Sequence, residues 1–146
     1  MALVDQDFTI EQGSTFLLEF VLRNDDNTPL PLTVQNPNVS NEFLIGEYSF
    51  RMKMRKSKYR GASAYSLSNT SVLQVGDKEL GKTADSFYII SEDPGKVWML
   101  ISPASTSAIK HGKYFFDIES VKGASGSEEV IKVLSGKFVV NAEATN

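Results

Sequence analysis

Residues 16–22 read Phe-Leu-Leu-Glu-Phe-Val-Leu, and residues 114–119 read Tyr-Phe-Phe-Asp-Ile-Glu. In both stretches apolar side chains recur at every second position, and a period of two gathers them on one face of a β-strand. Similar short runs continue from end to end of the chain, separated by turn residues such as those at 24–27 and 93–95. No stretch keeps an apolar period of 3.6 over three turns. The pattern therefore predicts an all-β protein.

The spacing of the runs indicates the architecture. Turn residues come about every ten positions, which predicts eight or nine strands in an antiparallel two-sheet β-sandwich. We expect at most one short helix, over 103–110, because Pro103 suits a first helical position and Gly112 follows the stretch. No repeat or linker interrupts residues 1–146, so we predict a single domain with a mobile polar tail over 141–146.

Several segments receive individual predictions. The stretch 33–46, rich in asparagine and proline, is predicted to be a long loop, and the poorly patterned stretch 57–71 is predicted to be a loop that could contain a short strand. We expect two final strands, 129–134 and 137–140, on either side of Gly136. The run 96–102 is apolar on both faces, which indicates an interior strand covered on both sides or a contact surface.

The composition limits the possible functions. The 146 residues include one histidine and no cysteine, so the chain has neither disulfides nor a thiolate zinc site. This fits a reducing compartment. The net charge of −3 argues against a general nucleic-acid binder. No apolar run is long enough to span a bilayer, and the first residues do not resemble a secretory signal, so we expect no membrane partner.

The candidate catalytic features are weak, and we predict no enzyme, no cofactor and no metal. Residues 76–83 read Gly-Asp-Lys-Glu-Leu-Gly-Lys-Thr, which matches a phosphate-binding loop. A strand-like run follows, however, where that loop requires a helix N-terminus. His111 has no serine or cysteine nucleophile in a recognisable motif beside it. The carboxylates are scattered over turns and outward positions, where they aid turn formation and solubility.

The most distinctive charged stretch is a basic run. In the predicted strand 48–55, Phe50, Met52 and Met54 face inward and the intervening basic residues face outward. A solvated strand edge would use such residues against aggregation. Alternatively, the stripe docks to an acidic partner protein, or to nucleic acid, which the acidic composition and the lack of interleaved aromatic residues disfavour. The candidate protein-docking residues are Arg51, Lys53, Arg55, Lys56, Lys58 and Arg60.

Aromatic residues suggest another alternative. Trp98, Tyr88, Phe87 and Phe115 lie in predicted strands and could stack on a sugar, although aromatic residues there usually belong to the core. A carbohydrate-binding module for host surface glycan would require Trp98 or Tyr88 to be exposed in a groove.

Three stretches together resemble a known family: QGSTFLLEFVL at 12–22, IKHGKYFFDIE at 109–119 and KVLSGKFVV at 132–140. The chain is similar to virion proteins of tailed bacteriophages, in particular to the N-terminal β-sandwich of upper baseplate proteins from phages of marine bacteria and cyanobacteria. The turn over 25–29 departs from the family pattern, with Asn27 where glycine is usual, and the family implies no role for the basic stretch 51–60 or the long loop 33–46.

The resemblance implies a function. The chain would be a structural part of a virion, assembled in the cytoplasm of the bacterial host. Within the virion, the role most strongly implied is that of a tail or baseplate adaptor or attachment protein. Capsid decoration is the alternative within this class. The implied partners are other virion proteins and copies of the chain itself in a symmetric assembly. The family brings no catalytic residues.

Overall fold

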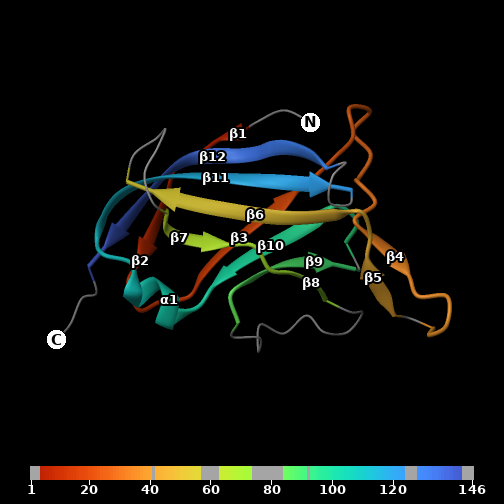
Figure 1. Ribbon diagram of the computed structural model, residues 1–146, viewed down its shortest axis with the longest axis horizontal. Coiled ribbons are helices and arrows are strands. Elements are labelled where there is room, and N and C mark those ends of the chain that lie inside the picture. The colour runs from red at the N-terminus through yellow and green to blue at the C-terminus, as the bar shows by residue number, and fades with distance from the viewer. Residues whose placement is uncertain are drawn as a thin grey trace.

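A computed structural model of the chain describes residues 4–40, 42–56, 63–73, 84–91, 93–123 and 128–142. This part is mostly β with one short helix (Figure 1), which confirms the all-β prediction. It contains twelve strands, more than the eight or nine expected. The predicted mobile tail over 141–146 is wrong at its start, because Asn141 belongs to β12, and residues 143–146 lie outside the described residues. The elements are β1 Val4–Asp5, β2 Phe8–Glu11, β3 Phe16–Val21, β4 Thr33–Gln35, β5 Phe43–Ile45, β6 Tyr48–Arg55, β7 Ser63–Leu67, β8 Thr70–Leu73, β9 Ser86–Ile90, β10 Lys96–Ile101, α1 Pro103–Ala108, β11 Gly112–Lys122 and β12 Glu129–Asn141.

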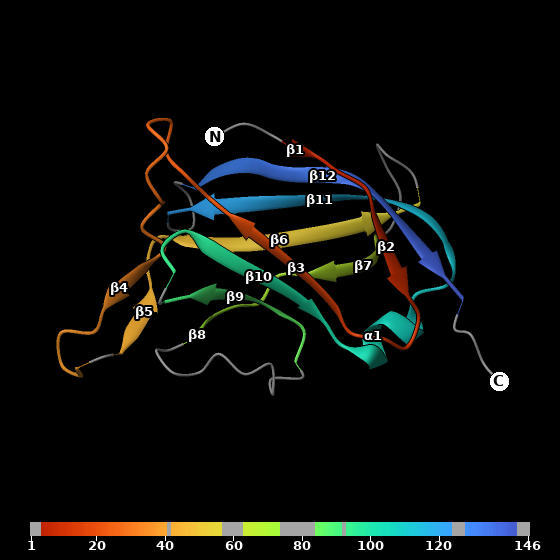
Figure 2. The ribbon, with the colours of Figure 1, turned by 180° about the vertical axis from the view of Figure 1, so that it is seen from behind.

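The strands form two larger sheets and a small ribbon. The six-stranded sheet has the order β1-β12-β11-β6-β7, and β2 also pairs with β12. The four-stranded sheet has the order β3-β10-β9-β8, and Figure 2 shows β3 and β10 crossing in front of β6. Strands β4 and β5 form the ribbon, which projects at one end of the molecule in both views.

The pairing is mixed and not purely antiparallel as predicted. Strands β1 and β2 both pair in parallel with β12, and β8 pairs in parallel with β9. None of these parallel pairs is joined by a tight hairpin. Strands β1 and β2 lie at the opposite end of the chain from β12, and residues 74–85 separate β8 from β9. Alternation of apolar residues predicts strands, but the direction of such remote partners depends on how the sheets assemble.

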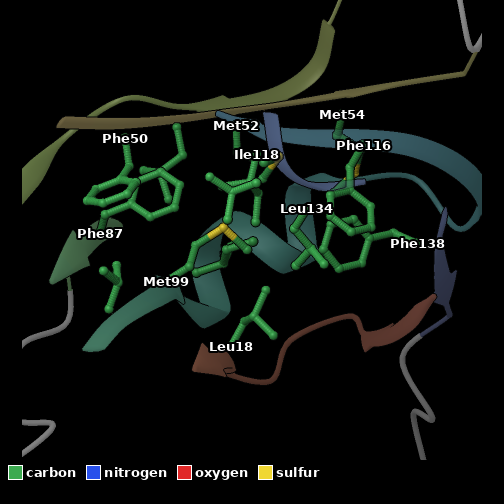
Figure 3. Packing of buried hydrophobic residues seen from close by; sticks show 14 of the residues in the cluster. Leu18, Phe50, Met52, Met54, Phe87, Met99, Phe116, Ile118, Leu134 and Phe138 are labelled. Atoms are coloured by element: carbon green, nitrogen blue, oxygen red, sulfur yellow. The ribbon is translucent and has the colours of Figure 1, made fainter. Parts of the chain in front are cut away.

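The two larger sheets contribute side chains to one hydrophobic cluster, seen in Figure 3. Phe50 from β6 packs on Phe87 from β9, with ring centroids 5.7 Å apart. Phe116 and Phe138 from β11 and β12 approach to 4.3 Å. Every second residue of β6 is buried, as the period of two requires. The predicted inward positions of Phe50, Met52 and Met54 are confirmed.

Strand β10 is an interior strand with apolar residues on both faces, as predicted. Val97 and Met99 enter the main cluster. Leu100 faces the other way and belongs to a second cluster with Tyr88 and Ile90, against which Trp98 packs. Continuous apolar runs are typical of strands covered on both faces.

Both predicted loops contain strands. Over 33–46, β4 and β5 pair through Val34 and Leu44, and the turn residues occupy only the tip. There the Asn36 N–H donates to the Glu42 carbonyl over 2.8 Å, and Asn36 Oδ1 accepts from the Asn38 N–H. Strands β7 and β8 lie within the second predicted loop and its end. The loop prediction for 33–46 was wrong because β4 and β5 are only three residues long, too short for an apolar alternation to show.

The two predicted final strands are one strand, β12, which continues through Gly136. Gly136 has a φ of 155°, and a Cβ there would lie 2.0 Å from the Gln6 carbonyl oxygen. Glycine is therefore needed for the close approach of the segment between β1 and β2, and it does not mark a turn.

Helix α1 confirms the predicted short helix, although it ends at Ala108. The Ser102 side chain accepts a hydrogen bond from the Ser105 N–H, the usual N-cap contact. Thr106 is buried, and its hydroxyl donates to the Ser14 carbonyl over 2.8 Å, while the Gly13 N–H donates to it. These bonds tie the helix to the turn before β3.

Candidate functional site

The basic run lies on the outer face of the six-stranded sheet. Arg51, Lys53 and Arg55 alternate with the buried residues of β6 and point away from the core, as predicted. Strand β6 is flanked by β11 and β7, so it is not an edge strand. Protection of a free edge therefore does not explain the three basic residues.

Register brings carboxylates from β11 beside these cations. Glu119 lies opposite Arg51, and its Oε1 is 2.7 Å from Arg51 Nε. Asp117 lies opposite Lys53, and its Oδ1 is 3.8 Å from Lys132 Nζ on β12. The pairs are partly exposed, so each contributes little to stability. Their main effect is to hold the long side chains in place.

We call this surface the charged face; its members are Arg51, Lys53, Arg55, Lys132, Lys137, Asp117 and Glu119. Five cations and two carboxylates give it a net charge of +3. Six of the seven residues, all but Lys137, line a depression of about 160 Å³. Among the described residues, no ion pair engages Lys53, Arg55 or Lys137. The face therefore keeps a positive charge for a partner to meet.

Phe115 lies within this surface. It is opposite Arg55 on one side and Lys137 on the other, and Lys137 Nζ lies 5.8 Å from its ring centroid. Arg55 Nε is buried without a hydrogen-bond partner. The combination of a half-buried aromatic ring with flanking cations is common in protein interfaces, which are enriched in aromatic residues and arginine.

Of the remaining predicted docking residues, only Lys56 is described, and it does not join the face. Lys56 lies at the end of the sheet, where its Nζ is 4.4 Å from the Tyr114 ring centroid. Lys58 and Arg60 lie outside the described residues.

The sequence argument missed four members of the charged face. Asp117, Glu119, Lys132 and Lys137 come from strands that were predicted, and the outward position of the first two follows from their alternation with apolar residues. Their proximity to β6 depends on the order and register of the strands. A bulge at Ile118/Glu119 also shifts Lys132 into line with Glu119, and no local signal indicates that shift.

The described residues do not bring the candidate catalytic features together into a site. His111 is exposed beyond the end of α1, and residues 76–83 lie outside the described part of the chain. In that part, no three acidic or histidine residues gather in a way that could hold a metal ion. No helix among the described residues is long and apolar enough to cross a membrane.

The four aromatic residues do not form a stacking platform. Phe87 is in the main core, whereas its neighbour Tyr88 is buried in the second cluster on the opposite face of β9. Phe115 belongs to the other large sheet. Trp98 is half-buried, and its Nε1 donates to Glu19 Oε2 over 2.7 Å. Of the two residues on which sugar stacking would depend, Tyr88 is buried and Trp98 is only partly accessible.

A polar cluster centres on Asp85. Its carboxylate accepts hydrogen bonds from the Tyr65 hydroxyl and, over 2.8 Å, from the Ser102 N–H at the start of α1. Burial raises the pKa of Asp85, but the hydrogen bonds from Ser105, Tyr65 and Ser102 outweigh it and hold the pKa below its usual value. Burial and Asp85 together raise the pKa of Tyr65. The cluster links β7, β9 and α1, a structural role.

Comparisons with known proteins add no functional assignment. No protein-family model matches the chain, and no curated protein matches it significantly. The functional argument therefore depends on the charged face and on the motifs in the sequence.

Proposed function

We propose that the chain is a non-enzymatic structural component of a bacteriophage particle that docks onto other virion subunits. Within the particle it would serve as a tail or baseplate adaptor or attachment protein, and it would be assembled in the cytoplasm of the bacterial host. The observation that carries the proposal is the charged face, whose net charge of +3 belongs to a chain with a net charge of −3. Such a contrast suits a surface that orients an acidic partner.

The resemblance to phage virion proteins supports this proposal from another direction. Two of the three matching stretches fall in β11 and β12, the paired strands that carry four members of the charged face. The third falls in the turn before β3 and in β3 itself. These stretches resemble the family in motifs that build a fold and not in motifs that build a catalytic site.

We also infer that the described elements amount to a two-sheet β-sandwich. The inference is supported by the single cluster to which both larger sheets contribute, in which β6 meets β9 through Phe50 and Phe87. A rigid two-layer scaffold suits a protein that holds a fixed place in an assembly.

Immunogold electron microscopy tests the function. An antibody raised against the purified chain would be applied to particles concentrated from a culture of the source phage. Label on the tail or baseplate is the expected result. Label over the capsid would contradict the adaptor role and support capsid decoration instead. Particles that carry no label, with the chain found free in the lysate, would contradict a virion role.

A further inference from the structure

Negative charge gathers along one edge of the six-stranded sheet. Strands β1 and β2 follow the outer side of β12 and expose Asp5, Asp7 and Glu11, which we call the acidic edge. The first basic residue of the chain is Arg23, so no lysine or arginine of this segment offsets them. Within the described residues, none of the three carboxylates forms an ion pair.

The acidic edge is held in place by β12. The Gln6 N–H donates to the Ser135 carbonyl over 2.8 Å, and Asp7 Oδ1 accepts from the Lys137 N–H. Glu11 Oε1 accepts from Asn141 Nδ2 over 3.1 Å. The last two bonds each use one carboxylate oxygen, and the side chains of Asp5, Asp7 and Glu11 all remain exposed. The edge therefore presents a fixed row of negative charge.

The acidic edge and the basic strand of the same copy are too far apart to neutralise each other. Strands β12 and β11 lie between the edge and β6, and three strand spacings amount to about 14 Å. The Debye length at physiological ionic strength is about 8 Å. The edge therefore does not neutralise Arg51, Lys53 and Arg55 of its own copy. Lys132 and Lys137 lie on β12, directly beside the edge, but within the described residues neither forms an ion pair with it.

We propose that the acidic edge of one copy docks on the charged face of a second copy. The three carboxylates of the edge carry −3, which matches the +3 of the face. Because the two patches differ, the contact is heterologous, and repetition would produce a ring or a helical filament. This inference rests on the docking role proposed above and names the partner. The rest of the chain outside the charged face carries a net charge of −6, which would repel a nucleic acid.

Light scattering on the purified chain at low salt tests the contact over a range of concentrations. Lys53→Glu and Asp5→Lys each reverse one exposed charge, on the charged face and on the acidic edge respectively. Lys110→Glu and Glu128→Lys are matched controls at exposed positions outside both patches. Unchanged circular dichroism would confirm that each variant is folded.

We expect wild type and both controls to associate, and association to weaken as salt rises. Each test variant alone should associate roughly tenfold more weakly. An equimolar mixture of Lys53→Glu and Asp5→Lys should regain complexes, because the first retains a wild-type edge and the second a wild-type face. This recovery is specific to a head-to-tail contact.

Other results would overturn the inference. These are a wild-type chain that stays monomeric at low salt, association unaffected by the test variants, a mixture without recovery, or association abolished by nuclease. A monomeric chain that still enters phage particles would contradict self-association while leaving the proposed function intact. Absence from particles, with association retained, would contradict the function alone.

Discussion

The outer faces of the two larger sheets follow the same alternation but differ in chemistry. On the six-stranded sheet, the outward residues of β6 and β11 are mostly charged and are at least partly exposed. On the four-stranded sheet, the outward residues of β9 and β10 include Tyr88, Ile90 and Leu100, which are buried. The comparison teaches that an apolar period of two predicts a strand with one face in the core. Whether the opposite face is covered is indicated by the residues that alternate with the core residues: charged ones on an open face, apolar ones on a covered face.

Leu100→Ala should show the largest difference between the two faces. Removal of a buried leucine typically costs about 2–5 kcal/mol, because apolar contacts are lost and a cavity remains. Lys53→Ala on the charged face should change the free energy of unfolding by less than about 0.5 kcal/mol. Urea denaturation of both variants measures the contrast. Equal losses would contradict the assignment of one face as covered and the other as open.

Gly136→Ala should have the next largest effect and should act on the acidic edge. The added Cβ would collide with the Gln6 carbonyl oxygen, and φ at this position is unfavourable for other residues, which costs about 1–3 kcal/mol. Hydrogen exchange should rise for Gln6 before it rises in β10. Uniform protection in wild type and variant would be inconsistent with the close approach described above.

Asp85→Asn should remove a pH-dependent contribution to the free energy of unfolding. Asp85 lies between the two larger sheets, bonded to Tyr65 of β7 and to Ser102 before α1. The folded pKa of Asp85 lies below its usual value. Its stabilisation is therefore present above the unfolded pKa of about 3.9 and is lost as pH falls through the folded pKa. Thermal unfolding should separate wild type from variant at pH 7, and the gap should narrow below about pH 4. A difference in melting temperature that widens in acid would contradict a folded pKa of Asp85 below its usual value.

The smallest effect is expected for the pair Arg51–Glu119 on the charged face. A double-mutant cycle with Arg51→Ala and Glu119→Ala should give a coupling energy of about 0.2–1 kcal/mol, because the pair is partly exposed. The coupling should fall in high salt. A coupling above about 3 kcal/mol, insensitive to salt, would mean that the face is closed to water and is no docking surface.

The alternation in the sequence was sufficient to predict β6, β10 and β11, together with which of their residues are buried. It failed for β4 and β5, because three-residue strands are too short for a period to appear. It also treated Gly136 as a turn, because the close approach of Gln6 comes from a segment about 130 residues away. Such contacts depend on strand order, which local patterns do not contain.

The candidate site was predicted in part for the same reason. The outward direction of Arg51, Lys53 and Arg55 follows from the pattern of a single strand. The carboxylates that pair with them, and the acidic edge, require the order and register of β1, β2, β11 and β12. The bulge at Ile118/Glu119 is a further tertiary feature that aligns Glu119 with Lys132.

Incorporation into particles tests most directly the claim that the chain docks through the charged face. Tagged wild-type, Lys53→Glu and Lys110→Glu chains would be supplied during infection, and each would be quantified in purified particles. The account predicts that wild type and Lys110→Glu enter particles equally, while Lys53→Glu falls roughly tenfold. Equal incorporation of all three chains would contradict it.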